Sequence, residues 1–280
     1  MKSRRIAALA IASVFLLGSC DAILGFNLFE GMVQDGVVRN IEEAETADDY
    51  MAESDAENFI EALEETGKVE DAVGALEEVY DPDADPETPP PGDPAEAQEA
   101  AAVAAEIIIY TSPAGVVVDN IIEVIAGDPA ALDVEDPATL IAAIIPPSIT
   151  GDAAAFEETI LGFLDAWEAY AALGASITGG ELATVEVQAG DLIIPAAIGA
   201  ALSELVAAEM AASSTDEATA TAQIIAGLLD AATGGTPTLP EIEMVMQEGS
   251  EIPAFLADGS PLANILLAAG FDIAALLGGS

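Results

Sequence analysis

The side chains available for covalent or metal chemistry in this 280-residue chain are one thiol and many carboxylates. The chain contains 51 aspartates and glutamates, one cysteine, Cys20, and no histidine. Without an imidazole there is no Ser-His-Asp or Cys-His arrangement and no HExxH zinc site. Ser176 lies in a stretch that begins like a nucleophile elbow, but Thr178 replaces the closing glycine and no base is present. The sequence therefore predicts that the protein is not an enzyme and uses no cofactor.

Three carboxylates have the spacing that opens a calcium-binding loop. Asp81, Asp83 and Asp85 form a D-x-D-x-D pattern. However, Pro86 occupies the position at which an EF-hand loop requires glycine, and Gly92 stands where a bidentate glutamate would close the site. The sequence therefore predicts no metal site, and these three aspartates are the remaining candidate ligands.

Residues 1–19 have the features of a secretory signal peptide. Lys2, Arg4 and Arg5 form a positively charged start. The uncharged apolar run that follows, from Ile6 to Leu17, is too short to cross about 30 Å of hydrocarbon. We therefore expect this segment to direct export and not to remain as a transmembrane helix.

The end of this signal resembles the bacterial lipobox, which consists of an aliphatic residue, two small residues and a cysteine. The matching residues are Leu17, Gly18, Ser19 and Cys20. The resemblance to bacterial lipoproteins implies cleavage before Cys20 and lipidation of its thiol, with palmitate among the acyl chains. It also implies that the membrane is a partner and that the mature protein lies in the cell envelope, at the periplasmic or outer surface. The alternative is an ordinary signal peptide beside an unrelated cysteine.

The charge balance of the mature chain is extreme. After residue 19 only Arg39 and Lys68 are basic, and two positive charges against 51 negative ones give a net charge of −49. Such a surface repels nucleic acid, which we exclude as a partner. The acids are spread over nearly the whole chain, which favours adaptation to high salt. The alternative is a docking surface for a basic protein partner or a sink for cations.

The composition favours closely packed helices. Apolar residues make up 52% of the chain and aromatic residues 5%, so alanine, isoleucine, leucine and valine must build the core. We predict an all-α fold, either an alanine-rich multi-helix bundle or an irregular helical array with an N-terminal αα-hairpin. One short strand is expected at 184–188. The predicted helices after the hairpin are 95–110, 114–126, 137–145, 152–173, 195–212 and 215–232, with shorter ones between 240 and 278.

The sequence also predicts how these elements divide the mature chain. A tether, 20–53, leads from the lipid to a helical hairpin, 54–80, which begins at a Ser54-x-x-Glu57 capping box and turns at Gly67. An acidic, proline-rich linker or loop, 81–94, separates the hairpin from a helical domain, 95–280.

The second half of this hairpin resembles a tetratricopeptide repeat, as found in some exported lipoproteins. The residues that carry the resemblance run from Gly67 to Val73, followed by Leu76 and Pro82. The resemblance implies that Ala72 packs between the two helices and that the proline closes the unit. No 34-residue period repeats the pattern downstream.

The best amphipathic helix, 152–173, carries four aromatic residues on one face. They are Phe156, Phe163, Trp167 and Tyr170, and they form either the centre of the core or the lining of an apolar groove. We therefore carry two expectations for function. The first is a lipid-anchored interaction or structural protein adapted to high salt. The second is a ligand-binding or transporter-accessory lipoprotein with an apolar groove between helices.

Overall fold

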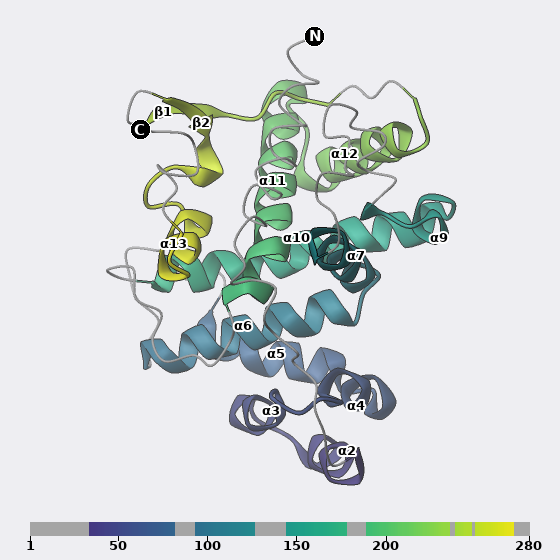
Figure 1. Ribbon diagram of the computed structural model, residues 1–280, viewed down its shortest axis with the longest axis vertical. Coiled ribbons are helices and arrows are strands. Elements are labelled where there is room, and N and C mark those ends of the chain that lie inside the picture. The colour runs from purple at the N-terminus through teal and green to yellow at the C-terminus, as the bar shows by residue number, and fades with distance from the viewer. Residues whose placement is uncertain are drawn as a thin grey trace.

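The computed structural model describes residues 34–81, 93–126, 144–177, 189–235, 239–247 and 250–271. Figure 1 shows helices stacked across the molecule and one small sheet. The predicted all-α class is confirmed, in the form of a helical array. The elements are α2 (Gln34–Glu43), α3 (Ala47–Glu53), α4 (Phe59–Thr66), α5 (Val69–Tyr80), α6 (Pro94–Tyr110), α7 (Ala114–Ala126), α9 (Pro147–Thr150), α10 (Ala153–Ser176), α11 (Ala189–Ser213), α12 (Glu217–Ala232), β1 (Met244–Gln247), β2 (Ser250–Pro253), a 3-10 turn η2 (Ala254–Leu256) and α13 (Pro261–Ala268).

Helices α6 and α10 form the centre of the array and run antiparallel. The Gln98 side chain near the start of α6 donates to the carbonyl oxygen of Ser176 at the end of α10, at 3.3 Å. At the other end, Gly162 of α10 lies directly against Ser112, which follows α6. Helix α6 also packs on α5 (Figure 1), so it is buried on almost every side. Alanine suits this position because a small side chain lets helices approach closely on both sides.

Helix α11 crosses α10 steeply, as Figure 1 shows. The crossing point is Gly199, where an added Cβ atom would lie only 2.7 Å from the carbonyl oxygen of Phe163. Real Cβ atoms do not approach backbone oxygen so closely, so the contact requires glycine. Helix α12 then packs on α11 through a small second cluster formed by Val206, Ala220 and Ile224.

The segment predicted as a tether is largely helical, which corrects that prediction for residues 34–53. Helices α2 and α3 lie in this range, and Ile41 and Tyr50 are fully buried in the core. Helix α3 begins at a capping box: the Asp49 carboxylate accepts from the backbone N–H and the hydroxyl of Thr46, at 3.0 and 2.8 Å. Val37, Ile41 and Ala44 follow helical spacing and form one apolar face. Burial of this face stabilises the helix more than the many acids on the opposite face destabilise it.

The predicted hairpin segment contains two helices, α4 and α5, which make few contacts with each other, because α4 packs mainly on α2 and α5 on α6. The start of the segment also differs from the prediction. Ser54 does not open a helix; its hydroxyl donates to the carbonyl oxygen of Met51 at the end of α3, at 2.8 Å. Helix α4 starts at Phe59, after Asn58. Its end at Gly67 is as predicted: the residue has φ of 67°, and the N–H of Lys68 donates to the Leu63 carbonyl oxygen. This is a Schellman end, which favours glycine because the left-handed conformation strains other residues.

The hairpin and the later helices share one hydrophobic core. Ala72, Leu76 and Tyr80 of α5 are buried in the same cluster as the residues of α6 and α10. Residues 82–92 of the predicted linker lie outside the described residues. The proline-rich segment therefore separates the two helices in sequence, whereas their side chains pack together in space.

Most later helices lie where the sequence predicts them, with corrections at two places. Helix α12 begins at Glu217, two residues after the predicted start at 215, because Asp216 caps it and accepts from the N–H of Thr219 at 2.9 Å. Between 240 and 278, β1 and β2 form an antiparallel hairpin with Val245 opposite Ile252, ahead of α13. The predicted strand 184–188 and most of the predicted helix 137–145 lie outside the described residues.

Judged by length and apolar composition alone, one described helix could cross a membrane. It is the part of α11 from Leu192 to Ser213, and 56% of its most apolar window is buried inside the protein. A bent pair, α6 with α7, meets the same criteria if it is counted as one span, although the two helices turn by 94°. Burial of this kind is typical of core helices.

Candidate functional site

The predicted lipidation site precedes the described part of the chain. Cys20 and the lipobox residues Leu17, Gly18 and Ser19 all lie before Gln34, where α2 begins. The first helix among the described residues begins fourteen residues after Cys20. Lipidation of Cys20 stays a prediction.

The candidate calcium ligands are not brought together in the described residues. Asp81 is exposed and follows the end of α5, with φ of 45°. Asp83 and Asp85 lie outside the described residues. Over the ranges that the structure describes, no group of three or more acidic side chains is placed to hold a metal ion.

The four aromatic residues of α10 lie at the centre of the fold. Phe156, Phe163 and Tyr170 are buried in the main hydrophobic core. Trp167 is half-buried, packs against that core and lies beside Gly199 of α11. These side chains fill space between helices, which fits the core alternative and leaves them unavailable as the lining of an apolar groove.

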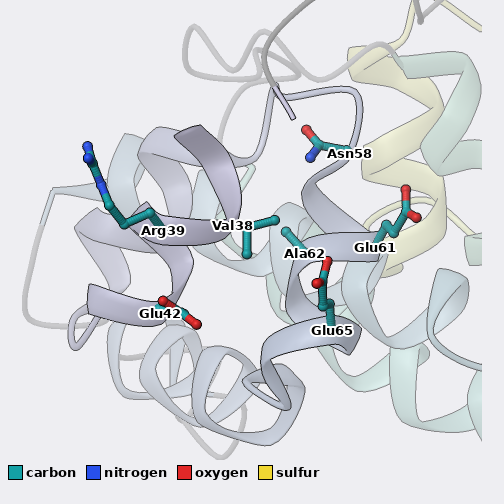
Figure 2. Close-up of a pocket in the computed structure, with 7 residues that line it drawn as sticks. All are labelled: Val38, Arg39, Glu42, Asn58, Glu61, Ala62 and Glu65. Atoms are coloured by element: carbon teal, nitrogen blue, oxygen red, sulfur yellow. The ribbon is translucent and has the colours of Figure 1, made fainter. Parts of the chain in front are cut away.

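A groove does lie elsewhere, between α2 and α4 (Figure 2). Its volume is about 540 Å³, and its lining consists of Val38, Arg39, Glu42, Asn58, Glu61, Ala62 and Glu65. Val38 is half-buried and Ala62 is buried, so together they give the groove an aliphatic floor. The three glutamates are exposed around it. We call this site the α2–α4 groove.

The two helices position these side chains through their buried faces. Val37 and Ile41 of α2 and Phe59 and Leu63 of α4 belong to one core cluster, which holds the helices side by side. Glu61 and Glu65 are four residues apart on α4 and therefore share a face. Figure 2 shows Glu42 across from them on α2, whereas the Arg39 side chain points away from α4. The result is a concave surface with carboxylates from both helices.

Sequence reasoning missed this groove because it assigned residues 20–53 to a tether. A usable signal was present. Val37, Ile41 and Ala44 recur at i, i+4 and i+7, which is the spacing of one helix face. That signal would have predicted α2, but the groove itself depends on how α2 packs on α4.

Lys68, the other basic residue after residue 19, has a structural role. Its Nζ atom lies 3.3 Å from a carboxylate oxygen of Asp71 and donates to the carbonyl oxygen of Ala44, also at 3.3 Å. Lys68 therefore ties the start of α5 to the end of α2. The nearby Tyr50 hydroxyl donates to the same Ala44 oxygen, and burial raises the pKa of this tyrosine.

Three further titratable groups have a pKa raised mainly by burial. Partial burial raises the pKa of the carboxyl groups of Asp119 and Asp165, because the charged form loses hydration. Burial likewise raises the pKa of Tyr80, and the carboxylates of Glu77 and Glu168 add to this effect. Asp119 and Asp165 lie on different helices, α7 and α10.

In comparisons with known proteins, the chain matches no family model, no curated protein and no solved structure. The candidate site is therefore defined by its geometry and charge.

Proposed function

We propose that this chain is an exported lipoprotein, held by Cys20 to a membrane outside the cytoplasm, that acts without catalysis as an interaction or structural protein in high salt. The observation that carries the proposal is the charge of the folded surface. Among the residues whose burial the structure describes, no aspartate or glutamate is buried. Arg39 and Lys68 are the mature chain's only basic side chains, so nearly all of these carboxylates lack a cationic partner within the chain.

A surface of this kind fits a concentrated salt solution. Unpaired carboxylates repel one another and raise the free energy of the compact state. At about 1 M salt the Debye length falls to about 3 Å, so most of this repulsion is screened. Exposed acids occur on α2, α5, α10 and α12, and not on one element alone, which is what adaptation to the solvent requires.

The alternative of a ligand-binding or transporter-accessory protein requires an apolar groove between helices. The aromatic residues that would line it, Phe156, Phe163 and Tyr170, are buried in the core. Their burial favours the interaction or structural role over this alternative.

The anchor is tested by labelling cells with palmitate and comparing the wild-type chain with Cys20→Ser. We expect the wild-type chain to carry the label and to stay with membranes after a carbonate wash. A lipoprotein carries several acyl chains, which anchor it stably, whereas a single acyl chain binds a membrane only marginally. Cys20→Ser should carry no label and should remain unprocessed or be released. Ser19→Ala serves as the control, since alanine keeps a small residue before the cysteine. Label on Cys20→Ser would contradict the proposal.

A further inference from the structure

The α2–α4 groove is lined by three glutamates and one arginine, Arg39, so its lining keeps a net negative charge. Glu42, Glu61 and Glu65 take part in no ion pair with Lys68, and Figure 2 shows the guanidinium of Arg39 directed away from α4. Concave surfaces concentrate the potential of charges of one sign. A cation placed between the two helices would therefore be attracted more strongly than one above an isolated exposed glutamate.

The shape and lining of the groove indicate which cation fits. A metal ion does not fit, because within the described ranges no three carboxylates are placed to hold one. The groove has an aliphatic floor, Val38 and Ala62, below its charged rim. Lysine and arginine match this arrangement, since both bury an aliphatic stem and keep the charged head at the surface. Its volume of about 540 Å³ lies within the range of about 300 to 1,000 Å³ that is usual for binding pockets.

We infer that the α2–α4 groove binds a lysine- or arginine-bearing segment of a partner protein, with the basic heads beside Glu42, Glu61 and Glu65 and an aliphatic part over Val38 and Ala62. This inference rests on the proposed role as an interaction protein, and it names the surface and the chemistry of the partner. The groove begins at α2, fourteen residues after Cys20 in the sequence, so a partner at the same membrane surface can reach it.

High salt makes the groove distinguishable from the rest of the acidic surface. Exposed charges attract weakly at about 1 M salt. The three groove glutamates are exposed in the free chain, but a basic side chain seated over Val38 and Ala62 would partly cover them, and partly buried pairs are screened much less. A basic segment that gains aliphatic contact within the groove should keep its affinity under conditions that abolish binding to exposed glutamates elsewhere.

The experiment measures binding of a short fluorescein-labelled peptide of lysine and leucine to the full mature chain by fluorescence anisotropy, at about 1 M sodium chloride. A peptide in which glutamate replaces lysine is the probe control. The test variant is Glu61→Gln with Glu65→Gln. The matched control is Glu157→Gln with Glu158→Gln, which removes the same number of charges from an exposed face of α10. Circular dichroism verifies that both variants are folded.

We expect the groove variant to weaken binding of the basic peptide about tenfold and the α10 variant to change it less than about twofold. Equal weakening by the two variants would overturn the inference, because it would show attraction to net charge alone. Absence of binding by the wild-type chain at this salt concentration would overturn it as well. Neither result bears on palmitate labelling of Cys20, so failure of the groove and failure of the anchor are separable.

Discussion

At the scale of single residues, Gly199 decides how closely α11 can approach α10. An added Cβ atom would lie 2.7 Å from the Phe163 carbonyl oxygen and 2.8 Å from the Cβ atom of Trp167. The first neighbour is backbone, which cannot move aside without shifting the helix. The packing of two long helices therefore depends on the absence of one methyl group.

We predict that Gly199→Ala lowers the free energy of unfolding by about 1 to 3 kcal/mol, the usual cost of overpacking a core. The control is Gly74→Ala in α5, where an added Cβ atom meets nothing within 4 Å. That substitution should raise stability by about 0.5 to 1 kcal/mol, because alanine loses less backbone entropy in a helix. Urea unfolding at fixed high salt measures both. A loss of stability in both variants would contradict the prediction.

The carboxyl group of Asp165 gives a prediction for pH dependence. Partial burial raises its pKa in the folded state above the unfolded value of about 3.9, so the folded protein holds this proton more tightly. Ionised Asp165 therefore costs stability above the folded pKa, and this cost disappears as the pH falls towards the unfolded value. We expect Asp165→Asn to raise the melting temperature at pH near 7, with a gain that shrinks on acidification.

Glu158→Gln on the same helix is the control for this measurement, because it also removes one negative charge, from an exposed position. Thermal melts of both variants between about pH 4 and 7 separate burial from net charge. Equal gains in the two variants would show that general charge repulsion, and not burial of Asp165, determines the effect.

At the scale of elements, helices with strong local signals were predicted closely. The predicted 152–173 corresponds to α10, capped by Asp152, whose carboxylate accepts from the Ala154 N–H at 3.0 Å. Helix α6, predicted from residue 95, begins one residue earlier at Pro94, where Asp93 is the cap and proline suits the first helical position. These features are local, because a cap and an apolar face both act within a few turns.

The elements that were missed depend on contacts distant in sequence. Helix α2 is stabilised by packing on α4, and without that contact its short, acid-rich sequence has little tendency to form a helix. The strand pair β1 and β2 forms from two four-residue segments, which are too short for periodicity to identify. The α2–α4 groove could not be predicted for the same reason, since neither helix contains it alone.

The contact between α5 and α6 predicts that the hairpin and the later helices unfold together. Leu76 of α5 is fully buried in the common core, so Leu76→Ala should cost about 2 to 5 kcal/mol. Trp167, the only tryptophan, lies on α10 and reports on the centre of the array. We expect its fluorescence and the far-ultraviolet circular dichroism of the variant to change in one transition, at a lowered temperature.

The neighbouring Glu77→Ala is the control, because Glu77 is exposed and its loss should change stability by less than about 0.5 kcal/mol. If circular dichroism falls first while Trp167 fluorescence stays unchanged, the hairpin is an independent unit, as the proline-rich segment 81–94 alone would suggest.

At the scale of the whole molecule, a net charge of −49 after residue 19 predicts a broad dependence of stability on salt. Sodium chloride should raise the melting temperature gradually up to molar concentrations, because screening has no fixed stoichiometry. A specific calcium site would act differently, since a ligand bound only to the folded state stabilises it by RT ln(1 + [L]/Kd). We expect no steep response to micromolar calcium in a low-salt buffer freed of metals by chelation.

The control is the combined substitution of Asp81, Asp83 and Asp85 by asparagine. Its salt response should match that of the wild-type chain. A sharp calcium response that this variant abolishes would make the acidic segment after α5 a functional site and would contradict salt adaptation as the sole role of these aspartates.

The scarcity of basic residues limits where trypsin-like proteases can cut the chain. After residue 19, enzymes that cut after lysine or arginine have two sites, Arg39 and Lys68. The side chain of Lys68 is held by Asp71 and the Ala44 carbonyl oxygen. Even complete digestion by trypsin leaves residues 69–280 as one fragment. The chain therefore resists trypsin-like enzymes through its composition as well as its fold. Carboxyl-directed labelling, in contrast, has exposed acids to react with on α2, α5, α10 and α12.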